Sequence, residues 1–122
     1  MSKKVHLATF ENLPVNRVVA QAAPEVAPTA LNDADASDVS GRNYLYVSVD
    51  GFVGGVTAWE GTLYLQRYIS DTEFAWAAAN NQTYSETTTF AERFDVTGAR
   101  NAKFVVTSIT GGTSVDVNQR VM

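Results

Sequence analysis

The chain has 122 residues, no cysteine and a formal net charge of −4 at pH 7. This length predicts a single domain that can bury a core without cross-links. The composition excludes disulfides and thiolate metal sites, and the mild negative charge argues against a nucleic-acid partner. No apolar run approaches the roughly 20 residues needed to cross a bilayer, so we expect no membrane partner.

Residues 1–40 differ in composition from the rest of the chain. All three prolines precede Gly41, all eight glycines lie at or beyond it, and every aromatic residue except Phe10 falls within residues 43–122. A segment with spaced prolines and almost no aromatic side chains cannot easily close a core of its own. We therefore predict an extended N-terminal arm over residues 1–40 and a sandwich domain over residues 41–122.

The predicted arm contains two stretches that alternate as strands do, at 4–10 and 16–22. Two arrangements are open. The arm could lie on a neighbouring subunit, since about 25 extended residues reach on the order of 80 Å, or it could supply a first strand of the sandwich and a long linker. If the arm lies on a neighbouring subunit, we expect that deleting residues 2–30 leaves a folded sandwich that no longer attaches to that neighbour.

The segment 32–38 is the one acidic cluster of the sequence. Its spaced aspartates superficially resemble a calcium-binding loop, because Ca²⁺ needs several converging carboxylate oxygens. It lacks the central glycine and the final glutamate of an EF-hand loop, so we interpret it as a solvated linker.

From residue 43 onward the pattern is that of short strands separated by turns. Leu45, Val47 and Val49 alternate with polar or aromatic neighbours, and later strands are expected at 91–96, 104–109 and 114–121. Turns are predicted at Gly51, Gly61, Asp71, Gly98 and Gly111, a spacing close to that of a sandwich. We predict an all-β fold, an antiparallel β-sandwich of the jelly-roll or immunoglobulin-like type.

The stretch 61–76 predicts a β-hairpin, with two alternating runs joined by the polar residues 70–72. We expect Leu63, Leu65, Phe74 and Trp76 to face the core, and at most one helical turn after Trp76. The opposite face of the first run carries Tyr64, Gln66 and Tyr68. A stripe of outward tyrosines, which also includes Tyr44 and Tyr46, could bind sugars or another protein, or could be covered by the arm.

No catalytic constellation emerges from the residue types. His6 is the only histidine and has neither metal nor catalytic partners in the sequence. No nucleophile turn or phosphate-binding loop is present, and nothing in the spacing selects a carboxylate pair for glycoside hydrolysis. We expect no enzyme activity, no catalytic residues, no cofactor and no metal.

One set of residues resembles a known group of proteins. Trp59-Glu60-Gly61-Thr62-Leu63-Tyr64-Leu65-Gln66-Arg67-Tyr68, Glu92-Arg93-Phe94-Asp95-Val96 and the Gly111-Gly112 turn resemble small β-sandwich structural proteins of tailed bacteriophages. The resemblance covers roughly residues 43–121. It implies a virion component, first of all a capsid decoration or cement protein, and alternatively a tail or fibre adaptor.

The resemblance also implies the partners: the major capsid protein or another virion protein, and further copies of the chain in a homo-oligomer, for example a trimer. On a repeating surface, many weak contacts made at the same time would then give a high overall affinity. The candidate partner-binding residues are Val5, Leu7, Phe10, Val15, Val18, Tyr64 and Tyr68. A carbohydrate-binding module is the competing function, and it would need Tyr64, Tyr68 or Trp59 exposed as a flat platform.

Overall fold

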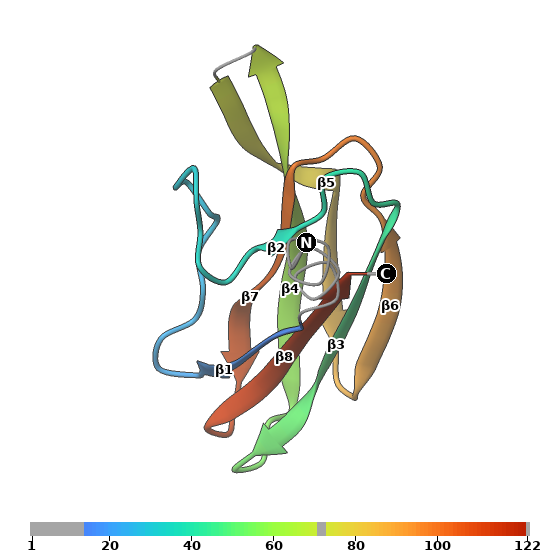
Figure 1. Ribbon diagram of the computed structural model, residues 1–122. Coiled ribbons are helices and arrows are strands. Elements are labelled where there is room, and N and C mark those ends of the chain that lie inside the picture. The colour runs from blue at the N-terminus through green and yellow to red at the C-terminus, as the bar shows by residue number, and fades with distance from the viewer. Residues whose placement is uncertain (1–13, 71–72, 122) are drawn as a thin grey trace, which may run out of the picture.

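The computed structural model describes residues 14–70 and 73–121, and within these the protein is a sandwich of two antiparallel four-stranded sheets (Figure 1). The strands are β1 (Val15–Ala20), β2 (Ser37–Asp38), β3 (Tyr44–Val53), β4 (Ala58–Ser70), β5 (Glu73–Glu86), β6 (Phe90–Asp95), β7 (Asn101–Thr110) and β8 (Ser114–Val121). The predicted all-β sandwich is confirmed.

The strand order identifies the sandwich as a jelly roll. One sheet has the order β1-β8-β3-β6, called sheet A below, and the other has the order β2-β7-β4-β5, called sheet B. Consecutive strands thus often lie in different sheets, which is the double Greek-key path of a jelly roll. Of the two sandwich types predicted from the sequence, the structure selects this one.

The core lies between the sheets and is centred on Trp59. Its indole meets the ring of Phe90 edge-on at 5.4 Å and that of Phe104 at 6.2 Å. The predicted inward residues of β3 are buried around this group. Trp59 therefore supplies core packing and no sugar-binding platform.

The β7–β8 hairpin forms as the Gly-Gly turn predicts. Gly111 and Gly112, two of the three residues between β7 and β8, have φ values of 69° and 68°, a left-handed conformation that glycine adopts at little cost. A Cβ on Gly112 would also lie 2.5 Å from a methyl group of Val56.

Two predicted turns are wrong. Gly51 lies inside β3, which continues to Val53 across an irregularity in its pairing with β8; the chain turns instead around Gly54 and Gly55. Gly61 lies inside β4, where a Cβ would lie 2.5 Å from the Phe104 ring. The missing side chain of Gly61 allows the backbone of β4 to approach the Phe104 ring closely. From sequence alone, a glycine with this role looks the same as a glycine that forms a turn.

The predictions for the second run of the β4–β5 hairpin also need correction. β5 continues as a strand to Glu86 with no helical turn, because its alanines pair with β4 and this pairing overrides their helix propensity. Phe74 and Trp76 are half-buried outside the core, opposite Tyr68 and Gln66. The register of the hairpin puts them on the outer face, while Leu63 and Leu65 are in the core as predicted.

Candidate functional site: two exposed surfaces

The candidate residues of the N-terminal segment are divided between described and undescribed parts of the chain. Val5, Leu7 and Phe10 lie outside the described residues. Val15 and Val18 belong to β1, which pairs with β8 as the edge strand of sheet A. Val15 is half-buried and Val18 is exposed. The described part of the segment thus contributes a strand to its own sandwich.

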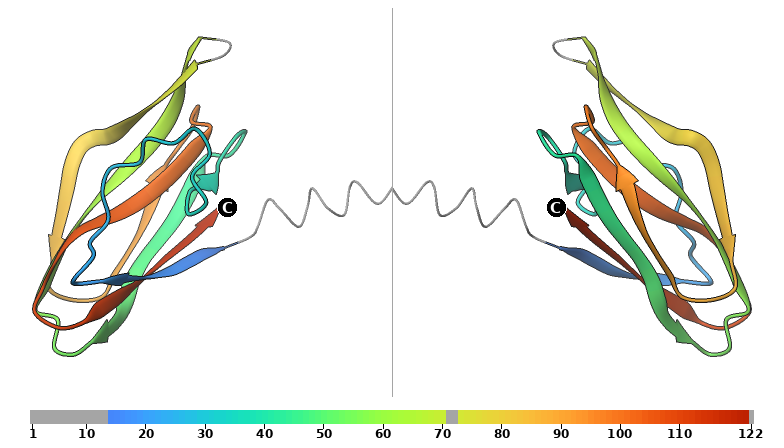
Figure 2. Two further views of the ribbon diagram at one scale, coloured as in Figure 1. Left: turned by 90° about the vertical axis from the view of Figure 1, so that its left-hand side faces the viewer. Right: turned by 90° about the vertical axis from the view of Figure 1, so that its right-hand side faces the viewer.

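The connection from β1 to β2 covers part of the outer face of sheet B (Figure 2, left). Gln66 donates a hydrogen bond to the Leu31 carbonyl at 2.8 Å, and the Trp76 indole donates one to the Ala30 carbonyl at 2.8 Å. Tyr64 is half-buried on this face. Tyr64, one of the tyrosines predicted to face outward, is therefore not exposed as a flat binding surface.

An ion pair ties this connection to both sheets. Arg17 of β1 contacts Glu25 through Nε–Oε2 at 2.6 Å and Nη2–Oε1 at 2.9 Å. Glu25 also accepts a hydrogen bond from the Val106 amide at 3.0 Å. Arg17 donates to the carbonyl of Phe104 and, at 3.0 Å, to the buried Gln119 side chain. These bonds close the side of the sandwich where β1 and β7 meet, which protects the edge of β7 from further pairing.

The acidic segment 32–38 is also tied to sheet B. Asp33 forms an ion pair with Lys103 at 3.1 Å and accepts a hydrogen bond from the Asp35 amide at 2.9 Å. Burial raises the pKa of Asp33, but the Asp35 amide and Lys103 together outweigh it and hold the pKa below its ordinary value. The described residues contain no group of three or more side chains placed to hold a metal ion.

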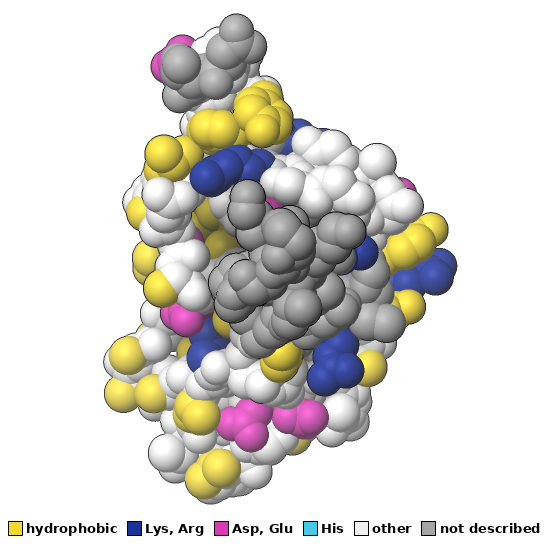
Figure 3. Space-filling view, viewed as in Figure 1, with side chains coloured by type: hydrophobic (Ala, Val, Ile, Leu, Met, Phe, Trp, Pro, Cys, Tyr) yellow, Lys and Arg dark blue, Asp and Glu magenta, His cyan; other side chains and the backbone are white. Residues whose placement is uncertain are grey.

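The first exposed surface is the far end of the β4–β5 hairpin, which extends beyond the two layers (Figures 1 and 2). Tyr68 and Ile69 are 63% and 65% exposed. The ring of Tyr68 packs on that of Phe74 with 4.6 Å between their centroids, and the Arg100 guanidinium lies over the Phe74 ring, 4.7 Å from its centroid. Figure 3 shows apolar side chains gathered at this end of the molecule. Tyr68 is thus one predicted binding residue that the structure leaves accessible.

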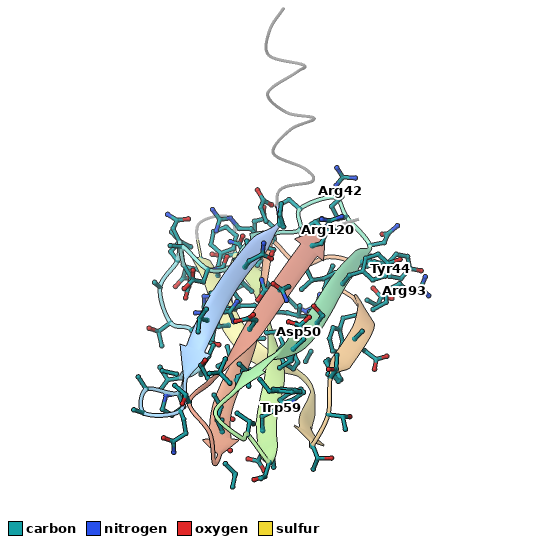
Figure 4. All side chains as sticks on the ribbon, turned by 90° about the horizontal axis from the view of Figure 1, so that it is seen from below. Arg42, Tyr44, Asp50, Trp59, Arg93 and Arg120 are labelled. Atoms are coloured by element: carbon teal, nitrogen blue, oxygen red, sulfur yellow. The ribbon has the colours of Figure 1, made fainter. Side chains whose placement is uncertain are left out.

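The second exposed surface is the outer face of sheet A (Figure 4). A groove of about 580 Å³ runs over it, with lining residues from all four strands. Tyr46 lies in this groove directly opposite Arg93 on one side and Arg120 on the other. The Arg93 guanidinium lies over the Tyr44 ring at 4.2 Å. We call Tyr44, Tyr46, Arg93 and Arg120 the arginine–tyrosine patch.

The sequence predicts only half of this patch. Alternation with buried Leu45 and Val47 places Tyr44 and Tyr46 on an outward face, as expected. The arginines are far away in the chain, and only the pairing of β3 with both β6 and β8 brings them beside Tyr46. No local pattern in the sequence encodes that register.

Within residues 14–70 and 73–121, no helix is long and apolar enough to cross a bilayer. His6, the only histidine of the chain, lies outside the described residues.

Comparison with known proteins gives a fold likeness only. No protein-family model and no curated protein sequence matches the chain. Among solved structures, the SPBc2 prophage-derived protein YomS is similar at 17% identity and a TM-score of 0.46, covering 90% of this chain and 96% of that one. The C-terminal family 22 carbohydrate-binding module of Clostridium thermocellum Xyn10B is similar at 8% identity and a TM-score of 0.37, covering 91% and 83%. At these levels neither likeness assigns a function.

Proposed function

We propose that this protein is a non-enzymatic structural component of a bacteriophage virion, held on the particle by its β4–β5 hairpin. The observation that carries the proposal is the exposure of Tyr68 and Ile69 at the end of a hairpin that extends beyond the sandwich. Adjacent large apolar side chains in such a position are typical of a protein contact, where a buried anchor of this kind contributes most of the binding energy.

Two further features support this proposal. The sequence resemblance to tailed-phage sandwich proteins includes the β4 segment from Trp59 to Tyr68, which leads into the end of the hairpin. The ring contact between Tyr68 and Phe74 and the Arg100 guanidinium over Phe74 hold the base of the apolar end in place. A preorganised anchor loses little conformational entropy on binding.

Within the virion, we propose decoration of the capsid as the primary role, with the major capsid protein as partner and a trimer as one possible assembly. A tail or fibre adaptor could use the same hairpin at another place on the particle. Quantitative mass spectrometry of purified particles distinguishes these roles. Hundreds of copies per particle support decoration, a dozen or fewer support an adaptor, and absence from the particle overturns the proposal.

The hairpin itself is tested by adding the purified protein back to particles that lack it. The wild type is expected to bind until sites are saturated, and the Y68S/I69S variant to bind at least tenfold more weakly. Val26→Ser is the matched control, because Val26 is 77% exposed but belongs to the β1–β2 connection. Equal binding by Y68S/I69S and wild type would rule out the hairpin as the anchor.

A separate truncation addresses the N-terminal segment. Removal of residues 2–13 takes away Val5, Leu7 and Phe10 and leaves β1 and its ion pair in place. If the truncated protein binds as weakly as Y68S/I69S, the segment contributes to attachment together with the hairpin. If it binds like the wild type, the hairpin suffices.

A further inference from the structure

From the geometry of sheet A we infer that its outer groove is a binding site for an oligosaccharide that carries a carboxylated sugar. This site is separate from the apolar hairpin and does not depend on the proposed virion role. It rests on three features of this outer face: an exposed aromatic ring, two arginines that form no salt bridge within the described residues, and a row of neutral hydrogen-bonding side chains.

The aromatic feature is Tyr46. Its side chain is 40% exposed, and the neighbouring Tyr44 is 37% exposed. An accessible tyrosine face can pack against the C–H surface of a sugar ring, while its hydroxyl remains available for hydrogen bonding. The groove around Tyr46 has a volume within the usual range for small-ligand sites.

The charged feature is the pair Arg93 and Arg120, which flanks Tyr46 on the adjacent strands. Within residues 14–70 and 73–121, neither guanidinium takes part in a hydrogen bond or an ion pair. Asp95, the next outward residue after Arg93, accepts a hydrogen bond from the Thr97 amide at 2.9 Å, and Arg93 acts on its carboxylate electrostatically without an ion-pair contact. Arg17, Arg67 and Arg100, by contrast, each donate hydrogen bonds to protein oxygens.

 

Guanidiniums that form no salt bridge can form charge-assisted, bidentate hydrogen bonds with the carboxylate of a ligand.

The neutral feature is a cross-strand row beside the patch. Asn16, Asn118 and Ser48 lie opposite one another on β1, β8 and β3. The Asn118 amide donates to Ser48 Oγ at 3.2 Å and to Asp50 Oδ1 at 3.3 Å. These bonds orient the carboxamide of Asn118, whose oxygen accepts no hydrogen bond within the described residues. The row therefore offers donors and acceptors suited to sugar hydroxyls.

The distribution of charge along the face favours a saccharide over a polyanion. The arginine–tyrosine patch lies at one end of sheet A, with the Glu92 side chain also lining the groove, whereas Asp50 and Asp116 lie opposite one another towards the other end (Figure 4). A nucleic-acid strand or a polyphosphate chain would be repelled by these two carboxylates, since it carries charge along its whole length. An oligosaccharide with one carboxylated unit can place that unit at the arginines and its neutral units along the polar row.

The test is a binding measurement on the full chain with defined probes. Tetragalacturonate, a hyaluronan tetrasaccharide and sialyllactose are the carboxylated probes; cellotetraose and lactose are neutral, and polyphosphate, single-stranded DNA and polyglutamate are the other anions. We expect at least one carboxylated oligosaccharide to bind with a Kd between about 10 µM and 1 mM, at least tenfold tighter than the neutral probes and the other anions.

Variants locate the site. Arg120→Gln and Arg93→Gln are each expected to weaken binding of that probe at least fivefold, and Tyr46→Ala at least tenfold. Arg67→Gln is the matched control, because Arg67 is an exposed arginine of sheet B, and it should bind like the wild type. Thermal unfolding of each variant establishes that it is folded, and Tyr46→Phe, which keeps the ring, should retain most of the binding.

Three results would overturn the inference. They are the absence of binding to every carboxylated oligosaccharide, equal binding of neutral probes or of the other anions, and unchanged binding by Arg120→Gln and Arg93→Gln. None of these results affects the proposed virion role, whose test depends on the hairpin.

Discussion

Arg17 on β1 and Glu25 in the following connection form a two-point ion pair, with Nε–Oε2 and Nη2–Oε1 distances of 2.6 and 2.9 Å. Their side chains are only 9% and 15% exposed. The pair joins the N-terminal strand to the backbone of β7, because Glu25 accepts from the Val106 amide and Arg17 donates to the Phe104 carbonyl. It makes residues 14–36 an integral part of the sandwich.

Glu25→Ala is expected to lower the free energy of unfolding by roughly 3 kcal/mol. The substitution leaves the Arg17 charge and the Val106 amide without their partner in a largely buried place, which is the costly way to break an ion pair. Urea unfolding measures the change, with Val26→Ala as the exposed neighbouring control. The double variant R17M/E25A should lose less than the sum of the two single variants, and strict additivity would contradict the coupling.

The Asp33–Lys103 ion pair predicts a dependence of stability on pH. The pKa of Asp33 in the folded protein lies below the 3.8 of the unfolded chain. The ionised carboxylate therefore stabilises the fold above that value, and this contribution is lost as the pH falls through the lowered pKa of the folded state.

Asp33→Asn should accordingly lower the free energy of unfolding by about 1–2 kcal/mol near neutral pH, the usual scale for a hydrogen bond to a charged group. The difference from the wild type should shrink as the pH falls below about 3.8. Denaturant unfolding at several pH values from 6 to 2.5 measures it, with Asp35→Asn as the control in the same segment. A difference that stays constant over this range would contradict the prediction.

Gly61→Ala is expected to destabilise the protein by about 2 kcal/mol through overpacking. The new Cβ would lie 2.5 Å from the ring of Phe104 and 3.1 Å from the ring of Trp59. Gly41→Asn is the control, because Gly41 has a φ of 71° but open space around it, and asparagine tolerates this conformation. Thermal unfolding compares the two, and an equal Tm for Gly61→Ala and the wild type would show that the ring moves freely.

Deleting residues 2–30 is now expected to prevent cooperative folding. The deletion removes β1, exposes the edge of β8 and takes away both partners of the Arg17–Glu25 ion pair. This reverses the expectation that goes with an arm lying on a neighbouring subunit, and it agrees with the other arrangement left open by the sequence, a first strand of the sandwich followed by a linker. Deleting residues 2–13 should leave the thermal transition cooperative, as followed by circular dichroism, and a folded 2–30 deletion would contradict this account.

The sequence alone is sufficient to predict the fold class and much of the core. The alternation of apolar and polar residues in Tyr44–Val49 and Ser114–Val121 predicts the buried residues correctly. In a strand with one covered face, every second side chain points into the core and is therefore apolar. The β7–β8 turn is equally local, since two adjacent glycines supply the backbone conformation that the turn requires. Absence of cysteine likewise excludes disulfides directly.

Only the tertiary structure decides which strands become neighbours and what covers each outer face. Trp76 faces outward because the hairpin register places it opposite Gln66, and Glu25 reaches Arg17 because the connection folds back over β7. The arginine–tyrosine patch likewise forms only when β3 pairs with both β6 and β8. Local patterns specify which way a side chain points from its own strand, whereas these contacts depend on long-range pairing that no short stretch of sequence contains.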